Sequence, residues 1–405
     1  MTTHSKPKIL FISESVTLAH FARPFELSNT LDQEQYDIHF ACARHYQAFL
    51  QGSKHTLHTL ESIAPEQFKQ ALANGDPLYD YATLKSYVEA DLALIAQVKP
   101  DLIVGDFRIS LAISAKLAKV PYATISNAYW SPYATPQYPA PCLPLTRWLG
   151  VRVGSWLFAK VAPFAFKVHA LAMRKLHQHY GLPKIPLDLR RVYTEADYTL
   201  YADIPSLFPL NNPPDSHFFI GPVLWSPPIK EPDWWATLPT DRPIVYVSMG
   251  SSGTQSALQK VVDTLATENL TLLVASAGAT LTLPSVSNIF TSAYLDGNAA
   301  AQRADVVICN GGSLTCQQAF AYGKPVLGIA ANMDQFLNML GVTAAHAGVV
   351  LRADNLTSVQ LLGAYRQLIN DKQTLGSVQN LQQEVGVLLR KNLFAQFVAT
   401  LLARS

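Results

Sequence analysis

Short apolar runs alternate with helix-like segments along almost the whole chain, and this alternation constrains the fold more than any other feature. Runs of this length separated by helices are typical of parallel strands joined by crossover connections. In the first half, helical periodicity extends over 21–34 and 110–120, and the apolar runs are KILFIS (8–13), YDIHFACA (36–43), DLIVGDF (101–107) and PYATIS (121–126). The first half is therefore predicted to form a doubly wound α/β sheet.

The second half repeats this order of elements without repeating the sequence. A helix is expected over 255–267, and the apolar runs are PIVYVSMG (243–250), LTLLVASAG (270–278), NIFTSAY (288–294), ADVVICNGG (304–312) and KPVLGIAA (324–331). A chain of 405 residues is too long for one ordinary core, and two domains of roughly 200 residues are expected. The predicted fold class is α/β, with two facing Rossmann-like domains and a ligand cleft between them.

A proline- and tryptophan-rich segment, GPVLWSPPIKEPDWWATLPTDRP (221–243), separates the halves. Proline fixes the backbone angle φ and removes an amide donor, so this segment is expected to be an extended connector. We therefore predict an N-terminal domain over 1–225, a linker over 226–242 and a C-terminal domain over 243–390. Residues 391–405 are expected to form a helix that packs back on the N-terminal domain or makes a dimer contact.

Charge and cysteine content exclude several classes of protein. The formal net charge is +2 and no basic stripe occurs, so no nucleic-acid partner is expected. The four cysteines have neither Cys-x-x-Cys spacing nor a nearby histidine pair, which indicates free thiols in a reducing compartment. The N-terminus enters a strand-like run without a signal-peptide core, and a cytoplasmic location is expected.

The segment RWLGVRVGSWLFAKVAPFAFKVHALAMRKL (147–176) is apolar and aromatic, but three basic residues interrupt it. A spanning helix needs about 20 mostly uncharged residues, so no membrane span is expected. Two interpretations stay open. The segment is either a partly buried helix pair, or an apolar lobe that contacts a ligand or a membrane surface through its tryptophans and basic residues.

Two Gly/Ser turns follow apolar runs of the second half. Asn310-Gly311-Gly312-Ser313-Leu314-Thr315 precedes a helix, and MGSSGTQS (249–256) is a second turn of this kind. Unpaired amides and the helix dipole favour a diphosphate at such a turn, where glycines let it approach and hydroxyls donate to it. Neither turn matches Gly-x-Gly-x-x-Gly or Gly-Lys-Ser/Thr, and each taken alone could be only a turn.

Asp334 and Gln335 close the stretch that begins with the first of these turns. A carboxylate and an amide can each engage vicinal hydroxyls, as acceptor or as donor, which suits sugar recognition. Taken without its context, the pair could equally cap a helix.

The segment 292–336 carries Gly-Gly, Ser/Thr, a helix, Gly-Lys-Pro and Asp-Gln in register. It resembles the donor-binding signature of family 1 nucleotide-sugar-dependent glycosyltransferases of the GT-B fold, in particular the bacterial macrolide and antibiotic glycosyltransferases. The resemblance extends more weakly over most of the chain. It implies an acceptor-binding N-terminal domain and a C-terminal domain that binds the donor through Gly250, Ser251, Ser252, Tyr294, Leu295, Gly297, Asn310, Gly311, Gly312, Ser313, Leu314, Thr315, Gln318, Asp334 and Gln335.

The sequence departs from the family pattern at several donor positions. Asn310 stands where the family usually has a histidine on the diphosphate, and it can donate but cannot carry positive charge. Gln318 replaces a glutamate that commonly holds the ribose. Tyr294 keeps a base-stacking aromatic, but Asp296 and Gly297 replace the Pro-Gln of plant members. UDP-, dTDP- and GDP-sugars therefore all stay open as co-substrates.

His20 and Pro24 lie in the segment after the first apolar run, SESVTLAHFARPFELSNTL (13–31). His20 resembles the general base of the family, although its spacing to proline is one residue longer than the common His-x-x-Pro. Asp106, at the end of DLIVGDF, matches the aspartate that orients this base. A neutral imidazole can take the proton of an attacking hydroxyl, and a carboxylate can stabilise the resulting imidazolium. A catalytic dyad of His20 and Asp106 is predicted.

No Asp-x-Asp and no His/Cys cluster with metal-ligand spacing occurs, so neither a metal nor another cofactor is expected. Amides and a helix terminus would then stabilise the leaving diphosphate. The expected reaction is an inverting, single-displacement hexosyl transfer. Two other functions stay open: a non-catalytic nucleotide-sugar-binding accessory protein, and a nucleotide-sugar epimerase of the same fold.

The loop WSPYATPQYPAPCLPLTRWLG (130–150) is long and rich in proline and aromatic residues. It is expected either to line the acceptor site or to pack between the domains. Tyr129, Trp130 and Tyr133 are the predicted acceptor-lining residues, for an acceptor that is aromatic, polyketide-like or lipid-like. A homodimer also stays open.

Overall fold

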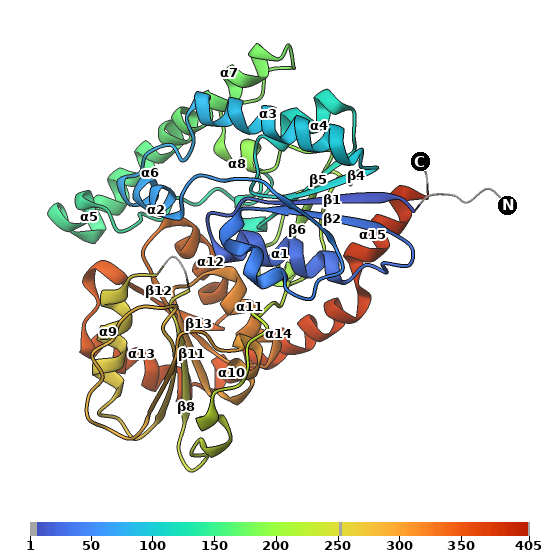
Figure 1. Cartoon of the computed structure of the whole chain (residues 1–405). Helices are drawn as coiled ribbons and strands as arrows, with labels where there is room; N and C mark the ends of the chain where they lie inside the picture. Colours follow the sequence, from blue (N-terminus) through green and yellow to red (C-terminus); the bar gives the residue numbers. More distant parts are fainter. Residues whose placement is uncertain (1–5, 251–252, 404–405) are drawn as a thin grey trace. The chain divides into compact units, whose positions relative to one another are not determined.

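The computed structural model describes residues 6–250 and 253–403, which form two compact units (Figure 1). Unit 1 comprises the residues up to 136, residues 160–223 and the residues from 391 onward, and unit 2 comprises 137–159 and 224–390. Each unit is built on one all-parallel sheet connected through helices. The predicted α/β class with two Rossmann-like sheets is confirmed.

Unit 1 contains a seven-stranded sheet in the order β3-β2-β1-β4-β5-β6-β7. Its central strands are buried along nearly their whole length, as expected for a parallel sheet covered on both faces. The strands are β1 Lys8–Ser13, β2 Asp37–Cys42, β3 Thr56–Thr59, β4 Leu102–Asp106, β5 Tyr122–Ser126, β6 Tyr198–Tyr201 and β7 His217–Phe219.

The helices of unit 1 begin and end at recognisable signals. Asp80 caps α3 by accepting a hydrogen bond from the Thr83 amide at 2.7 Å, and the helix ends at Lys99 in the left-handed conformation. The helices are α1 Leu18–Asn29, α2 Pro65–Asn74, α3 Tyr81–Val98, α4 Leu111–Ala118, α7 Leu171–His179, α8 Leu189–Tyr193 and α15 Leu393–Leu402, with 3₁₀ turns Arg44–Leu50, Ala128–Trp130 and Pro205–Leu207. The helix α6 (Gly150–His169) contains the division between the units, at residue 160.

Unit 2 contains a six-stranded sheet in the order β10-β9-β8-β11-β12-β13. Its core joins apolar residues of the strands to the inner faces of α9 and α13. The strands are β8 Ile244–Ser248, β9 Thr271–Ala275, β10 Ile289–Ser292, β11 Val306–Cys309, β12 Val326–Ala330 and β13 Gly348–Arg352. The helices are α5 Pro144–Trp148, α9 Gln255–Leu265, α10 Gly297–Arg303, α11 Ser313–Ala321, α12 Met333–Ala344, α13 Ser358–Asn370 and α14 Lys372–Lys391, with 3₁₀ turns Asp233–Thr237 and Ala353–Asn355.

One segment departs from the predicted domain boundaries, because residues 137–159 belong to unit 2 rather than to the N-terminal domain. The guanidinium of Arg352 donates to the carbonyls of Ala140 (2.7 Å) and Pro141 (3.0 Å), and the Cys142 amide donates to Ala331 O at 2.7 Å. Carbonyls in a proline-rich segment have few amide partners of their own, and Arg352 supplies the missing donors.

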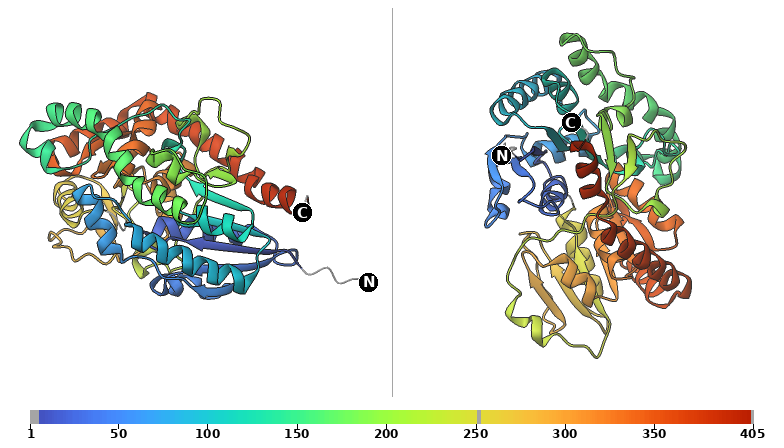
Figure 2. Two further views of the ribbon diagram at one scale, coloured as in Figure 1. Left: turned by 90° about the horizontal axis from the view of Figure 1, so that it is seen from above. Right: turned by 90° about the vertical axis from the view of Figure 1, so that its right-hand side faces the viewer.

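The last helix, α15, lies against the sheet of unit 1 (Figures 1 and 2). Phe394 is buried and its ring centroid lies 6.0 Å from that of Phe11 in β1. Phe397 contacts Tyr198 of β6 and Phe218 of β7, with centroid distances of 5.2 and 5.3 Å. The core of unit 1 is therefore completed by the C-terminal end of the described chain.

In each sheet the order in which successive strands are added reverses once. This topological switch point lies between β1 and β4 in unit 1 and between β8 and β11 in unit 2. The loops that follow the two central strands diverge to opposite faces at such a point, which leaves a crevice outside their carboxyl ends. Asp106 ends β4 beside Ser13 of β1, and Cys309 ends β11 beside Ser248 of β8. Asp106 thus lies at the switch point of one sheet, and the two predicted Gly/Ser turns follow the switch-point strands β8 and β11 of the other.

Candidate active site

His20 and Asp106 contact each other directly at the switch point of unit 1. The Nδ1 atom of His20 lies 2.8 Å from Oδ1 of Asp106, whose side chain is fully buried, whereas the His20 side chain is 17% exposed. Nδ1 also lies 3.1 Å from Arg23 Nη2, but that nitrogen donates to Asp106 Oδ1 at the shorter distance of 2.8 Å. Since a carboxylate can only accept, we assign the ring proton to Nδ1, which donates to Asp106. In the neutral ring with this tautomer, the other nitrogen, Nε2, is the one able to act as a base.

Arg23 binds the same carboxylate, a role that was not predicted from the sequence. Its Nε donates to Asp106 Oδ2 at 2.7 Å and its Nη2 donates to Oδ1 at 2.8 Å, a bidentate pair. Burial by itself lowers the pKa of Arg23, but the Asp106 carboxylate outweighs burial and that pKa is raised. Arg23 follows His20 by three residues, so both side chains leave the same face of α1.

The polar network continues from Arg23 to the ends of the next two strands. Arg23 Nη1 donates to Asn127 Oδ1 at 2.7 Å, and Asn127 Nδ2 donates to Asp203 Oδ1 at 2.9 Å. Asn127 directly follows β5, and Asp203 comes two residues after β6. All three side chains are buried, so the network fixes the position of Arg23 and, through it, of Asp106.

Phe107 packs against one face of the His20 imidazole ring. Its ring stacks on His20 with a centroid distance of 4.4 Å and an interplanar angle of 9°. Phe107 has a φ of +59°, the left-handed region, which is unfavourable for a bulky side chain. Backbone strain of this kind concentrates at functional sites, where the surrounding structure maintains it. Here it turns the chain so that Phe107 lies under His20.

A second buried network ties the loops after β1 and β4 together. Arg108 donates to Glu14 Oε2 and to Asp91 Oδ1, each at 3.1 Å, and its guanidinium lies 3.5 Å from the centre of the Tyr87 ring. Burial raises the pKa of both Glu14 and Asp91, although Arg108 opposes this. Since Glu14 directly follows β1 and Arg108 comes two residues after Asp106, this network joins the loop that precedes α1 to the loop that follows β4.

One of the predicted acceptor-lining residues, Trp130, belongs to an aromatic cluster that reaches His20. Trp130 contacts Tyr193 (centroid distance 5.3 Å), and Tyr193 contacts Phe107 (5.1 Å). Tyr129 instead packs on Phe208 (5.1 Å), and Tyr133 packs on His217 (5.1 Å) at the next strands. Ring contacts therefore connect Trp130 to the dyad.

The two predicted donor turns lie side by side in unit 2. Gly250 has a φ of +57°, and a Cβ built on it would lie 3.5 Å from Nδ2 of Asn310. Gly311 has a φ of +78°, and a Cβ there would lie 2.7 Å from Met339 Cγ. Both positions therefore favour glycine. The predicted donor residues Ser251 and Ser252 lie outside the described residues.

The N-terminus of α11 carries the amides expected to bind a diphosphate. Gly312 is its N-cap and has no capping side chain, while Ser313, Leu314 and Thr315 form the first turn and are partly exposed. The Asn310 carbonyl oxygen Oδ1 accepts from the Gly312 amide at 3.1 Å. The amides of a first helical turn lack intrahelical acceptors and attract anions.

A buried layer of polar and sulfur atoms supports this loop. Asn338 Nδ2 donates to Gly311 O at 2.9 Å and to the Cys316 sulfur at 3.3 Å, and the sulfurs of Cys309 and Cys316 lie 3.8 Å apart. The hydrogen bond from Cys316 to Cys309, together with burial, raises the pKa of Cys316 well above its usual value. Asn338 is a functional candidate that the sequence analysis missed.

Two predicted donor residues have structural partners. Gln318 is buried and its Nε2 donates to Trp225 O (2.8 Å) and Ser226 Oγ (3.0 Å), and a Cβ on Gly297 would lie 2.7 Å from its Oε1. Gln335 is buried, and its Oε1 accepts from the amides of Ala331 (2.8 Å) and Asn332 (3.2 Å) in a capping box. The Gln335 side chain therefore caps the start of α12, which is one of the two roles that the sequence left open.

Of the three remaining predicted donor residues of unit 2, two are accessible to solvent and one is buried. Asp334, the second residue of α12, is partly exposed, and Tyr294 is 41% exposed. Leu295 is buried between Tyr294 and Asp296. Asp296 caps α10 by accepting from the Asn298 and Ala299 amides at 2.9 and 3.2 Å. Asp296, which stands at a Pro-Gln position of the plant members of the family, thus has a structural role as the N-cap of α10.

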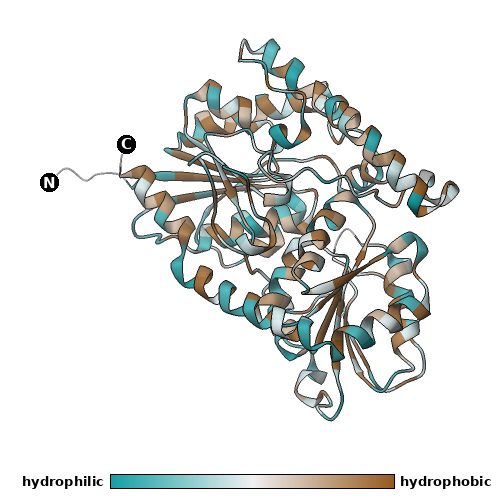
Figure 3. Cartoon of the chain, turned by 180° about the vertical axis from the view of Figure 1, so that it is seen from behind, coloured by the Kyte–Doolittle hydropathy of each residue, from teal (hydrophilic) through white to brown (hydrophobic). Residues whose placement is uncertain are grey.

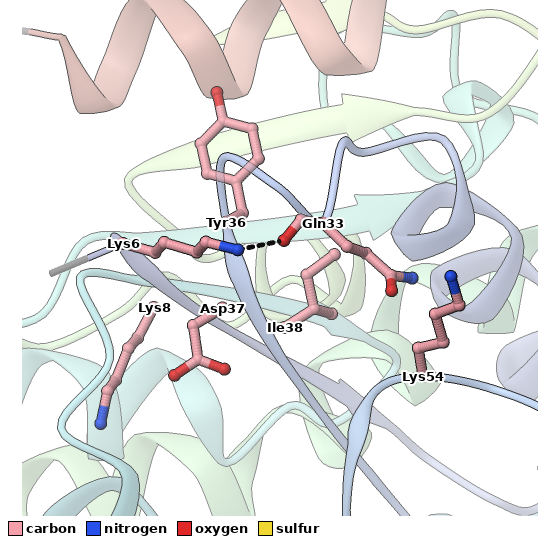
Figure 4. Close-up of a pocket in the computed structure, with 7 residues that line it drawn as sticks. All are labelled: Lys6, Lys8, Gln33, Tyr36, Asp37, Ile38 and Lys54. Atoms are coloured by element: carbon pink, nitrogen blue, oxygen red, sulfur yellow. Dashed lines mark hydrogen bonds between the residues drawn. The ribbon is translucent and has the colours of Figure 1, made fainter.

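A separate polar pocket lies at the amino-terminal ends of β1 and β2 in unit 1 (Figure 4). It is lined by the first residues of β1 and β2, Lys8 and Asp37, whereas the dyad follows the carboxyl ends of the strands. Lys6 in this pocket donates to Gln33 O at 2.9 Å. The pocket is therefore not part of the candidate active site.

The chain is similar to curated and solved proteins over most of its length. The family model of the glycosyltransferase family 28 C-terminal domain matches residues 244–388. A PGL/p-HBAD biosynthesis rhamnosyltransferase of Mycobacterium tuberculosis (strain ATCC 25177 / H37Ra) is 46% identical over 363 residues, covering 90% of this chain and 81% of that protein. A PGL/p-HBAD biosynthesis glycosyltransferase of the same strain is 42% identical over 381 residues, covering 94% and 89%.

Among solved structures, the spinosyn rhamnosyltransferase SpnG has a TM-score of 0.69 at 18% identity, covering 94% of this chain and 96% of that chain. A further structure of SpnG, complexed with thymidine diphosphate, has a TM-score of 0.66 at 18% identity. Similarity at this level of identity concerns the fold.

Proposed function

Because this chain belongs to the family of the PGL/p-HBAD biosynthesis glycosyltransferases, and is a glycosyltransferase of the predicted GT-B type, we propose that it transfers rhamnose or a related 6-deoxysugar. The donor is a nucleoside diphosphate sugar, and the acceptor is the hydroxyl of an apolar, lipid-like molecule. The rhamnosyltransferase name of a relative with 46% identity supports the sugar. The aromatic cluster from Trp130 to Phe107 supports an apolar acceptor.

We propose dTDP as the nucleotide, with UDP and GDP as the alternatives to be tested. The thymidine diphosphate complex of SpnG supports this choice. Within unit 2, the uncapped first turn of α11 offers amides to the diphosphate, and exposed Tyr294 offers a face to the base. Asp334 remains the proposed ligand of the sugar hydroxyls, whereas Gln335 supports it by fixing the start of α12.

The observation that carries the mechanism is the 2.8 Å contact between His20 Nδ1 and Asp106 Oδ1. In the neutral imidazole with its proton on Nδ1, Nε2 accepts the proton of the acceptor hydroxyl as the oxygen attacks the anomeric carbon. Asp106 then stabilises the imidazolium. The bond from the anomeric carbon to the diphosphate oxygen breaks as the new bond forms, which inverts the anomeric configuration. The helix terminus of α11 stabilises the departing diphosphate without a metal.

The test compares His20→Ala with the native chain in a transfer assay and in a thermal-shift assay with dTDP, UDP and GDP, each with and without magnesium. Transfer should fall by about 10²–10⁴-fold, the usual contribution of a general base. The shift produced by dTDP should be unchanged, because His20 lies in unit 1 and the donor residues lie in unit 2. Equal loss of nucleotide binding in His20→Ala would contradict the assignment. A shift that requires magnesium would contradict the metal-independent step.

A further inference from the structure

The outward side of α6 combines large apolar and basic side chains on one face. Val153, Trp156, Lys160, Phe164 and Lys167 follow one another at spacings of three or four residues, which places them along one side of the helix. We call these five residues the α6 outer row. Trp156 is 65% exposed and Phe164 is 67% exposed, and both lysines are exposed.

The opposite side of the helix is buried. Ala162 is fully buried and Phe166 is 8% exposed, and the Phe166 ring lies 6.0 Å from that of Trp130. The fold therefore holds α6 by its inner face. Apolar side chains on an outer face that packing does not use indicate a contact with something outside the molecule.

Charge identifies the chemistry of that contact. Residues 107–187 contain ten Lys or Arg and no Asp or Glu, although the whole chain carries a net charge of only +2. Arg152, which follows Val151 in α6, is exposed as well. Figure 3 shows hydrophobic and hydrophilic segments alternating along this helix. An apolar surface interspersed with lysines, within a long acid-free segment, complements an anionic lipid surface rather than an acidic soluble partner.

Two helical stretches of the described chain, Gly150–His179 and Lys372–Leu402, are long and apolar enough to cross a membrane by length and composition. In the first of these, the buried inner face and the lysines of the outer row favour a helix that lies along a surface. Lysine side chains can place their amines among headgroups while their methylenes stay in the apolar layer. Tryptophan is well suited to the same boundary.

We propose that the α6 outer row docks the protein on an anionic lipid surface, with Trp156 and Phe164 entering the headgroup boundary and Lys160 and Lys167 binding the anionic headgroups. The inner face of the same helix contacts Trp130 through Phe166. An acceptor dissolved in the membrane would therefore meet the aromatic cluster of unit 1 through the helix that binds the lipid. This docking extends the proposed function but does not depend on it, since lipid binding requires no donor.

The test is co-sedimentation of the full chain with vesicles of phosphatidylcholine alone or with about 30% phosphatidylglycerol, a composition within the range in which basic helices bind anionic surfaces. The native chain should bind the anionic vesicles, bind the neutral ones weakly, and be released by high salt. Lys160→Glu/Lys167→Glu should bind the anionic vesicles at least about thirtyfold more weakly, since each of the two basic residues contributes about 1 kcal/mol and a factor of ten corresponds to about 1.4 kcal/mol. Trp156→Ser/Phe164→Ser should bind both vesicle types more weakly.

Lys260→Glu and Val359→Ser serve as matched controls, because both side chains are exposed on helices of unit 2 and Val359 is 82% exposed. They should bind as the native chain does. Equal binding of outer-row and control variants, or no binding of the native chain to anionic vesicles, would overturn the proposal. Binding that resists high salt would indicate insertion instead. A change from dimer to monomer in Trp156→Ser/Phe164→Ser during sedimentation without lipid would show that a second copy covers this face.

Discussion

Arg23 and His20 share one oxygen of Asp106, with Arg23 Nη2 and His20 Nδ1 each 2.8 Å from Oδ1. Because the guanidinium also holds Oδ2 at 2.7 Å, it fixes the plane of the carboxylate to which the imidazole is bound. Asp106 is thus oriented before any substrate arrives. Burying the charged Asp106 carboxylate is unfavourable unless Arg23 pairs with it.

The first prediction concerns Arg23→Lys, which keeps the charge but loses the planar fork. We expect kcat to fall by about ten- to a hundredfold with the KM for the donor unchanged, because the base is displaced and the donor site is not. Steady-state kinetics measure the split. Arg190→Lys is the control, since Arg190 makes the same bidentate contact with Asp188 away from the dyad. A rise in donor KM with unchanged kcat in Arg23→Lys would contradict the positioning role.

The second prediction concerns Phe107, whose ring stacks on His20. Phe107→Ala removes the stack but keeps a Cβ at a φ of +59°, so the backbone strain remains. Stacking contributes about 0.5–1.5 kcal/mol, and kcat should fall by about three- to tenfold. Phe107→Tyr keeps the ring and should retain most of the activity. An unchanged kcat in Phe107→Ala would show that Asp106 alone orients the imidazole.

The third prediction concerns Asn338, which donates to Gly311 O and to the Cys316 sulfur beneath the donor loop. Asn338→Ala leaves a buried carbonyl unpaired, at a cost of about 1–3 kcal/mol. The loop should loosen, and the Kd for dTDP should rise by about tenfold in isothermal titration. Asn370→Ala is the control, because Asn370 donates to Arg366 O on an exposed surface. Equal Kd values for the two variants would exclude a role of Asn338 in donor binding.

The fourth prediction concerns stability at low pH. Burial lowers the pKa of His55 to about 4, and the neutral ring donates from Nε2 toward Ser28 Oγ (2.9 Å) and Asn29 Oδ1 (3.1 Å). Because this pKa is lower in the folded than in the unfolded state, the unfolded chain binds more protons between pH 6.5 and 4. The free energy of unfolding is therefore full above pH 6.5 and decreases as the pH falls toward 4, by on the order of 2–3 kcal/mol from this residue.

Urea unfolding at pH 7 and at pH 4.5 measures this decrease. His55→Gln should lose less stability between the two pH values than the native chain, because it removes one titrating group. His179→Gln, at an exposed position of α7, is the control and should follow the native profile. Parallel profiles for His55→Gln and the native chain would contradict the assignment.

The parts of this fold that the sequence predicted are those with strong periodicity. The buried strands β1, β4, β8 and β11 lie within the predicted apolar runs, because a parallel strand covered on both faces consists almost entirely of apolar residues. Shorter strands such as β7 (His217–Phe219) carry no such signal. The addition of residues 137–159 to unit 2 depends on Arg352, a tertiary contact that no local pattern encodes.

The candidate site was predictable where a polar residue ends a strand or directly follows it. Asp106 ends β4 and matches the aspartate of the resembling family, and Asn127, which directly follows β5, meets the same criterion. Arg23 could have been found from its spacing to His20 on one helix. The role of Phe107 could not be predicted, because it depends on a left-handed φ. A phenylalanine in the sequence gives no sign of that backbone conformation.

The return of α15 to unit 1 determines the order in which the protein can fold during synthesis. Every segment of unit 2 has been synthesised by residue 390, whereas unit 1 still lacks the helix that buries Phe394 against Phe11. Domains generally fold in the order of synthesis, but here the sheet that starts the chain is completed last. The apolar surface around Phe11, Tyr198 and Phe218 stays open to water until then, so the nascent chain carries a site for chaperones or aggregation that the finished protein does not have.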